Sequence, residues 1–463
     1  MQVYANSNRL SLKIVFFFLA VVFIAFLPIS SFLFFLKNDA FVGYFPPKFF
    51  MSESIHAGYL PLWNPYINFG FPQYGDMSGG FWSPITWFIA STVGYNAYTL
   101  TIEVLLYIFL GGLGMYQLTG YWQLGKKVRI IAGITFMCCG YNVGHLQHFN
   151  WISGAAFLPW CFWSYLLLLN QFTLKNTVRT VLIFYMLASS AHPGIIISSF
   201  YFFAAILVFH LFKKDNSQPL KKRIQQVGFS HFFFGLLFLL LSAGMITGYL
   251  DILPYFVRGE KISLDNSLLH PSNIQTWISA LLPFSTVKND GFFNTDLSMR
   301  NSYFGLALLL FFLQACVNKK NSWQIFLLVT GLLFALLSAG GIFKTFAYKF
   351  IPFLGYVRLN GEFRIFTLLC FIIIAAIELD KFISKKNTFT NTIKWNYYII
   401  EIILITCILV GFYESVTTKV SMVYGFKNIL QQNTIALKLK TLIDAVSFYD
   451  TFWIQGSMQL LLW

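Results

Sequence analysis

Residues 229–250 read FSHFFFGLLFLLLSAGMITGYL, a run without a charged side chain. A helix of about 20 apolar residues crosses the ~30 Å hydrocarbon core of a bilayer, so this run predicts a membrane-spanning helix. The chain contains eleven predominantly apolar runs, and a twelfth apolar stretch starts near Thr451. The sequence therefore predicts an all-α polytopic membrane protein with about 11–12 transmembrane helices. The eleven longer predicted spans are 14–36, 97–119, 129–146, 150–169, 179–191, 195–212, 229–250, 302–317, 324–339, 364–379 and 395–412.

The composition of the whole chain supports this class. Of the 463 residues, 57% are hydrophobic and only 11% are charged, with a mean hydropathy of +0.65. Soluble domains carry about 25% charged residues, which this chain lacks. These values argue against a soluble enzyme, a disordered chain and a nucleic-acid-binding protein. We expect the lipid bilayer, and no nucleic acid, as a partner.

The net charge of +15 is unevenly distributed along the chain. If the N-terminus is placed in the cytoplasm, 18 of the 32 Lys and Arg residues fall on the cytoplasmic side. Only two acids, Asp215 and Asp380, accompany them there. Basic loops stay on the cytoplasmic side of a membrane. We therefore expect a multi-pass protein of the plasma membrane with a cytoplasmic N-terminus, whose charge orients the chain rather than binding a polyanion.

The chain reads as a single membrane domain, 1–463, with three outer segments. These are a first outer loop with an interfacial helix (37–96), a second large loop (251–301) and a segment at 413–450. The first loop contains PLWNPYINFGFPQYGDMSGGFWSP at 61–84. Proline fixes φ and glycine permits positive φ, so this composition predicts an ordered loop with defined turns. Such a loop, with Trp63 and Asn64 in it, is suited to forming the wall of a site.

Two acids in this loop are candidates for proton transfer. Asp39 directly follows the first predicted span, in Lys37-Asn38-Asp39, and Asp76 lies in Tyr74-Gly75-Asp76. A partly desolvated carboxylate beside an ordered loop can serve as a general base. The alternative is a pair of solvated charges at helix ends.

Histidines also gather at the predicted outer ends. His145 and His148, in GHLQHFNW, are three residues apart and would share a face on one helix. Together with a carboxylate they could bind a divalent metal. The alternative is hydrogen bonding at a helix end, or contact with a hydroxyl or a phosphate. His192, in SSAHPG, lies at a tight outer turn that would place its imidazole beside the first loop.

Two arginines lie close to predicted hydrocarbon, Arg358 in PFLGYVRLN and Arg364 in GEFRIF. A guanidinium at this depth is expensive and is usually paired or functional. Its planar fork matches a phosphate bidentately. The alternatives are an ion pair with Glu362 and extension of the side chain to the lipid headgroups.

Several of these motifs resemble those of one protein family. The stretches 39–46, 58–66 (GYLPLWNPY) and 70–72 resemble the first outer loop of YfhO-family bacterial membrane proteins. Further similar motifs are GHLQH at 144–148, His192-Pro193 and PFLGYVR at 352–358, followed by Arg364. In these features the chain is similar to lipid-dependent glycosyltransferases of the GT-C type.

The resemblance implies a GT-C-like fold in a bacterial plasma membrane and a reaction on its outer side. The donor would be a sugar on a polyprenyl phosphate, and the acceptor an envelope glycan or a glycolipid. Asp39 would be the general base. The resemblance also implies a further C-terminal part of the protein. Two alternatives stay open, a transporter or flippase of lipid-linked glycans and a non-catalytic envelope-assembly protein. Residues expected to bind substrate or phosphate are Arg358, Arg364, His192, His145, His148, Asp76, Trp63 and Asn64.

Overall fold

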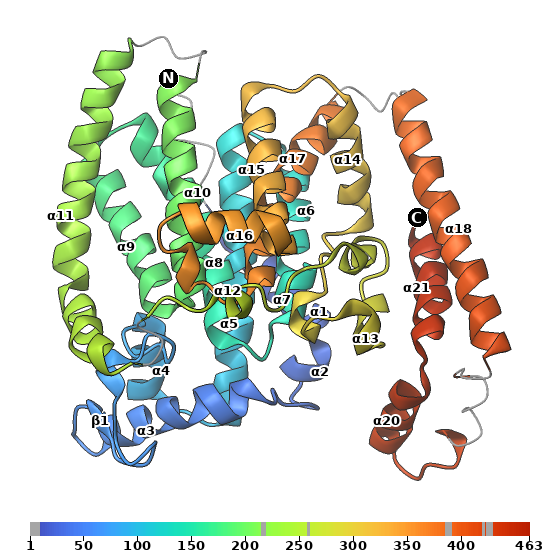
Figure 1. Ribbon diagram of the computed structural model, residues 1–463, viewed down its shortest axis with the longest axis horizontal. Coiled ribbons are helices and arrows are strands. Elements are labelled where there is room, and N and C mark those ends of the chain that lie inside the picture. Colours follow the sequence, from blue (N-terminus) through green and yellow to red (C-terminus); the bar gives the residue numbers. More distant parts are fainter. Residues whose placement is uncertain (1–9, 214–218, 257–259, 385–390, 419–421, 423–428) are drawn as a thin grey trace.

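The computed structural model describes residues 10–213, 219–256, 260–384, 391–418, 422 and 429–463. Within these ranges the chain is helical apart from turns, connections and one antiparallel pair of short strands, β1 (Trp63–Asn64) and β2 (Phe71–Pro72). Long helices lie side by side, and the elements of the first loop cap one end of the bundle (Figure 1). The cap consists of the π-helical turn η2 (Ala40–Tyr44), α3 (Phe45–His56), the strand pair, η3 (Gln73–Gly75) and α4 (Pro84–Thr92).

Helices of spanning length confirm that this is an all-α membrane protein. By length and composition, six helices of the described ranges can cross a membrane, and each coincides with a predicted span. Two shorter apolar helices are α1 (Leu12–Ala25) and α14 (Leu306–Val317). The larger number of 11–12 spans stays a prediction. The six are α5 (Ala97–Thr119), α8 (Phe149–Asn170), α10 (Pro193–Phe212), α11 (Leu220–Ile252), α15 (Ser322–Ala339) and α18 (Asn391–Thr417).

Polar caps set where two of these helices begin. Asn96 accepts hydrogen bonds from the N–H groups of Tyr98 and Thr99, and it forms a capping box at the start of α5. Asn321 forms the same arrangement with Gln324 at the start of α15. A capping box satisfies backbone donors that a first helical turn leaves without partners. The caps therefore favour these start points over a continuation of the preceding chain.

Helix α17 (Arg364–Ser384) packs against α6 (Lys126–Met137), α14 and α15. Every side chain from Arg364 to Leu379 is buried. The sequence shows why, because this stretch is apolar on all faces rather than along one stripe. Since α17 starts at Arg364, the packing of this helix also fixes the position of the segment that precedes it.

The predicted span 129–146 is not a continuous helix. α6 ends at Met137, and the single turn α7 (Gly140–Gly144) follows after a break. The Asn142 side-chain amide donates to the carbonyl of Phe136 at 2.7 Å, which caps the end of α6. The N–H of Gly140 donates to the carbonyl of Tyr303 at 2.8 Å instead of continuing the helix. A tertiary hydrogen bond therefore interrupts a locally apolar run.

Other predicted segments correspond to helices with shifted boundaries. The first predicted span corresponds to α1 and the short turn α2 (Leu27–Ser30), and the helix predicted in the first loop corresponds to α4, whose interfacial position stays a prediction. The span predicted at 179–191 lies in α9 (Leu174–Ser190). The outer segment at 413–450 contains α20 (Ile435–Ala445) and leads into α21 (Phe448–Leu462), which packs along α18. Asp215 and parts of 251–301 and 413–450 lie outside the described residues.

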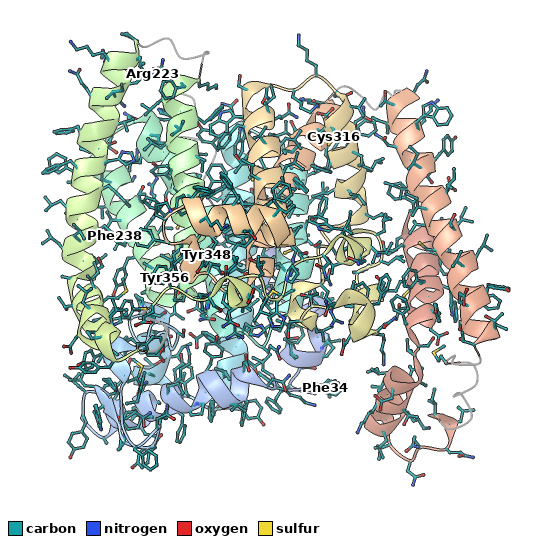
Figure 2. All side chains as sticks on the ribbon, in the orientation of Figure 1. Phe34, Arg223, Phe238, Cys316, Tyr348 and Tyr356 are labelled. Atoms are coloured by element: carbon teal, nitrogen blue, oxygen red, sulfur yellow. The ribbon has the colours of Figure 1, made fainter. Side chains whose placement is uncertain are left out.

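Basic residues gather at the end of the bundle away from the first loop. Arg223, labelled in Figure 2, lies near the start of α11, and the connection between α14 and α15 carries Lys319 and Lys320. Both lie at the end opposite α3 and α4 (Figure 1). This separation agrees with the charge asymmetry of the sequence. The cytoplasmic placement of that end stays a prediction.

Candidate functional site

A cavity of about 430 Å³ lies between the first loop, the turn from α7 to α8 and the segments that precede α10, α14 and α17. Five of the nine expected site residues line it, and they come from four separate parts of the chain. The wall also includes the aromatic side chains of Tyr44 and Trp151. The five expected residues are Asp39, Asp76, His148, His192 and Arg358.

Asp39 lies at the junction between the first helix and the cap. It immediately precedes η2, and the preceding Asn38 has a positive φ of 52°. The Asn38 amide donates to the side-chain oxygen of Gln147 at 2.8 Å, which ties this junction to the turn between α7 and α8. The Asp39 side chain is 63% exposed, and its Oδ2 lies 3.4 Å from Nε2 of His148. An accessible carboxylate therefore faces an imidazole across the cavity wall.

His145 and His148 do not share a face of one helix, contrary to the prediction. The chain turns between them, because α7 ends at Gly144 and His148 precedes the first residue of α8. Their rings are nevertheless close, with centroids 5.5 Å apart. His145 is fully buried behind the cavity, where its Nδ1 lies 2.8 Å from the carbonyl oxygen of Tyr141. His148 alone of the two reaches the cavity.

The indole of Trp151 joins the histidines into one wall. Its ring centroid lies 4.6 Å from that of His145, 5.2 Å from that of His148 and 5.2 Å from that of His192. Burial lowers the pKa of His148, although the charges of Asp39 and Asp296 oppose this effect. At neutral pH the imidazole of His148 is therefore uncharged, and its contact with Asp39 is not an ion pair.

His192 is held from behind by a buried carboxylate. Its Nδ1 lies 3.0 Å from Oε2 of Glu362, whose side chain is fully buried in η11 (Asn360–Phe363). A Cβ at Gly194 would lie 1.9 Å from Oε1 of Glu362, so glycine is required there for the carboxylate to approach. Nδ1 also lies 3.2 Å from the backbone nitrogen of Gly194, whose N–H donates to it when Nδ1 carries no proton. In either tautomer Nδ1 is engaged on this side, and Nε2 is the nitrogen left for a ligand of the cavity.

The two arginines have different surroundings. Arg358 is exposed and lines the cavity, and the described residues offer it no ion-pair partner. Arg364 is fully buried and donates to the carbonyls of Ser298, at 3.0 Å, and Met299. Both carbonyls belong to residues that line the cavity. The geometry thus leaves Arg358 available to an anion, whereas Arg364 supports the wall.

Acids on two sides make the cavity strongly polar. Burial raises the pKa of Asp76, and hydrogen bonds from the N–H groups of Ser78 and Gly79 oppose this effect. Asp296, which is not among the expected site residues, accepts from the N–H of Ser298 at 2.8 Å. Burial alone would raise the pKa of Asp296, but the hydrogen bonds from Ser298, together with nearby histidines, lower it. Asp296 is therefore a carboxylate at neutral pH.

His270 also lines the cavity and was not among the expected site residues. It precedes Pro271 just as His192 precedes Pro193, so the repeated His-Pro pair is a signal that could have identified it. Asp296 had a weaker signal, because aspartate is a common N-cap residue, and Asp296 is the N-cap of the short helix at Leu297–Met299. Neither pattern by itself separates a site residue from a structural one.

Trp63 and Asn64 are not among the residues that line the cavity. Trp63 is 58% exposed, and its ring covers Gly70, where a Cβ would lie 2.4 Å from the indole. The buried side chain of Asn64 accepts from the N–H of Tyr66 at 3.0 Å. These contacts stabilise the loop, and a role of either residue in substrate binding stays a prediction.

An ion pair beneath the first loop was not anticipated from the sequence. Nζ of Lys48 lies 3.0 Å from Oε1 of Glu103, and both side chains are buried. The ammonium also donates to Oγ1 of Thr86 at 3.0 Å and lies 3.8 Å from the ring centroid of Phe149. Together these contacts join α3, α4, α5 and the start of α8. The pair therefore holds the cap in place next to His148.

Within the described ranges, no group of three or more His, Cys, Asp or Glu side chains is arranged to hold a metal ion. Metal binding by His145 and His148, one of the alternatives for these residues, stays untested. Comparisons with protein-family models, with curated proteins and with solved structures found no match to this chain. Fold and site together define a helical membrane protein with a polar cavity beneath an ordered cap.

Proposed function

We propose that this protein is a membrane glycosyltransferase of GT-C-like fold and a relative of the YfhO family. It would transfer a sugar from a polyprenyl-phosphate-linked donor to an envelope glycan or glycolipid acceptor on the outer side of a bacterial plasma membrane. The observation that carries the proposal is the convergence of Asp39, His148, His192 and Arg358 on one cavity. These residues are far apart in the sequence, and the family resemblance had selected all four.

The size and polarity of the cavity support a ligand of this kind. Small-molecule sites occupy about 300–1,000 Å³, a range that includes this cavity of about 430 Å³. Several buried polar atoms in and behind the wall have no hydrogen-bond partner among the described residues. They include the Tyr141 hydroxyl, His145 Nε2, His148 Nδ1, Asn150 Nδ2 and Glu362 Oε1. The charged side chains that line the cavity, those of Asp39, Asp296 and Arg358, favour a polar occupant over an apolar one.

The residues supply the parts of a displacement at the anomeric carbon. The carboxylate of Asp39 takes the proton of an acceptor hydroxyl while that oxygen forms a bond to the anomeric carbon. The bond between the anomeric carbon and the phosphate oxygen breaks, and the lipid phosphate leaves with both electrons. The guanidinium of Arg358 stabilises the charge on that phosphate. The acids and imidazoles of the wall can hydrogen-bond the sugar hydroxyls.

The direct test is Asp39→Asn in the purified full chain, supplied with polyprenyl-phosphate sugars and candidate acceptors. Because the amide cannot accept the proton, we expect transfer to fall by about 10²-fold or more. Glu53→Gln is the matched control, since Glu53 is an exposed carboxylate on α3 that is not among the cavity residues. Full transfer by Asp39→Asn would refute the proposed mechanism.

A transporter or flippase of lipid-linked glycans is the second candidate. Glu103 and Glu401 lie within predicted spans, and acids inside a membrane often mark ion pathways. Glu103, however, forms a buried ion pair with Lys48, which weakens the case for an ion pathway. Translocation in proteoliposomes without covalent transfer would favour the transporter. Loss of both activities in every assay would favour a non-catalytic envelope-assembly role.

A further inference from the structure

Helix α16 (Gly341–Phe350) buries one of its two lysines and exposes its three phenylalanines, while Lys349, near its end, is exposed. Its Lys344 is completely buried, whereas Phe343, Phe346 and Phe350 are 51%, 59% and 67% exposed. These three phenylalanines lie three and four residues apart, so they form one outward face. Ile342, at 85% exposed, lies at the start of the same helix.

This arrangement indicates the medium outside α16. Against water, a helix lowers its free energy by exposing its charged side chains and burying its aromatic ones. Here the ammonium turns inward and the phenyl rings turn outward. That distribution is favourable only where the surroundings are apolar. Bulk water would select the opposite pattern.

The apolar face of α16 continues that of a candidate membrane span. The preceding helix, α15, exposes Val329 and Leu333 at 51% and 56%. The chain then turns through Gly340 and Gly341, which have φ values of +75° and +55°. α16 consequently lies across the end of α15 rather than along it (Figure 1). Both apolar faces are thus exposed on consecutive helices that meet at this turn.

Buried contacts connect α16 to the cavity. The Lys344 ammonium donates to the carbonyls of Leu354, at 3.1 Å, and Val357, at 2.9 Å. These carbonyls belong to η10 (Leu354–Tyr356) and to the residue before Arg358. Figure 2 labels Tyr348 on α16 and Tyr356 on the following turn. The Tyr348 hydroxyl donates to the carbonyl of Ile262 at 2.7 Å, so α16 is also fixed to the second outer segment.

We propose that α16 is an in-plane membrane helix whose phenylalanine face is covered by the acyl chains of one leaflet, and that Lys344 couples this anchoring to Arg358. Lys344 is then a positioning residue. It holds the turn that presents the Arg358 guanidinium to the cavity, so that the guanidinium lies at the level of the lipid headgroups. This inference does not depend on glycosyl transfer.

Site-directed spin labels test the membrane contact in the full chain, reconstituted in vesicles of phosphatidylethanolamine and phosphatidylglycerol. Labels are placed at Phe346→Cys, at Leu333→Cys as the lipid-facing reference and at Glu53→Cys as the water-facing reference. The signal of the chain without an introduced cysteine is subtracted. The readout is the ratio of collisions with oxygen, which partitions into lipid, to collisions with a water-soluble nickel chelate.

We expect the ratio at Phe346→Cys to match that at Leu333→Cys and to exceed that at Glu53→Cys severalfold. A ratio at Phe346→Cys closer to the water-facing reference overturns the membrane contact. Phe350→Cys, on the same face, replaces Phe346→Cys if that variant does not fold.

The coupling is tested with a label at Leu359→Cys, next to Arg358. Lys344→Met should increase the mobility of this label severalfold, because the two carbonyls lose their donor. Lys349→Met, an exposed lysine of the same helix, should leave the mobility unchanged. Lys344→Arg, which retains a donor, should restore much of the order. An unchanged line shape in Lys344→Met overturns the coupling. None of these measurements uses sugar transfer, so failure of the glycosyltransferase proposal would be seen separately.

Discussion

Nδ1 of His192 lies 3.0 Å from Oε2 of Glu362, although the two residues are 170 positions apart in the chain. The imidazole lines the cavity, whereas the carboxylate is completely buried behind it. A buried carboxylate at this distance fixes the orientation of an imidazole. The pair therefore gives the cavity an imidazole of defined orientation.

Glu362→Gln should lower the rate of sugar transfer by about tenfold or more, because the amide keeps the shape but not the charge behind His192. The effect should fall mainly on kcat rather than on KM, since the ring still lines the cavity. Gly194→Ala is the second variant, because its Cβ would displace the same carboxylate. Kinetics of both variants with wild-type values would contradict a role of the pair in catalysis.

Lys48→Met should destabilise the fold by about 3–5 kcal/mol, because it leaves the Glu103 carboxylate buried without its cation. Thermal unfolding in detergent, followed by circular dichroism, measures this loss. Replacing both partners in Lys48→Met/Glu103→Leu should recover much of it. Lys37→Met is the control, since Lys37 is an exposed lysine near the start of the same loop. Equal unfolding midpoints for Lys48→Met and Lys37→Met would show that the pair contributes nothing.

Acidification should destabilise the fold partly through His148. Burial keeps the pKa of His148 below its ordinary value of 6.5, so the unfolded chain binds the proton more readily than the folded chain. Stability from this group is therefore present above pH 6.5 and is lost as the pH falls from 6.5 toward the lower folded pKa. His148→Gln should flatten the dependence of the unfolding midpoint over this window. His56→Gln, which changes an exposed histidine, should leave the slope as it is.

Substitutions of the two arginines should show that Arg358 binds the lipid phosphate and that Arg364 supports the cavity wall. Arg358→Met should leave stability within about 0.5 kcal/mol, because Arg358 is exposed, but it should weaken binding of a polyprenyl phosphate about tenfold. Arg364→Met should lower stability by about 1–3 kcal/mol for each carbonyl that loses its donor, those of Ser298 and Met299. Unfolding midpoints and equilibrium binding to the labelled lipid distinguish the two outcomes. The reverse assignment would contradict the geometry.

Local patterns in the sequence predicted the helices well where the apolar run had matching caps. The span at 97–119 coincides with α5, whose capping residue Asn96 stands directly before it. The run at 129–146 was equally apolar, yet it breaks because the Gly140 N–H bonds to Tyr303. No pattern near residue 140 predicts a hydrogen-bond partner more than 160 positions away in the chain. Hydropathy alone could not locate that break.

For the candidate site, residue types were more predictable than contacts. Asp39, His192 and Arg358 were selected because each lies at the predicted outer end of a span, and all three line the cavity. Glu362 was considered as a partner for an arginine, but it lies against His192 instead. No pattern in the sequence predicts the pairing of Lys48 with Glu103, since no periodicity connects α3 with α5. Pairing depends on how helices pack, which a position at a helix end does not specify.

The chain's membrane class, its helical content and the asymmetry of its charges follow from the amino-acid sequence, because hydropathy and charge act over short stretches of backbone. The broken span, the pairing of His192 with Glu362, the burial of Lys344 and the shared cavity follow from the folded arrangement. Apart from the contacts of Lys344, which reach carbonyls 10 and 13 residues further on, these are contacts between segments distant in sequence. Such contacts form when burial removes polar groups from water, so that each group must find a partner wherever packing brings one near.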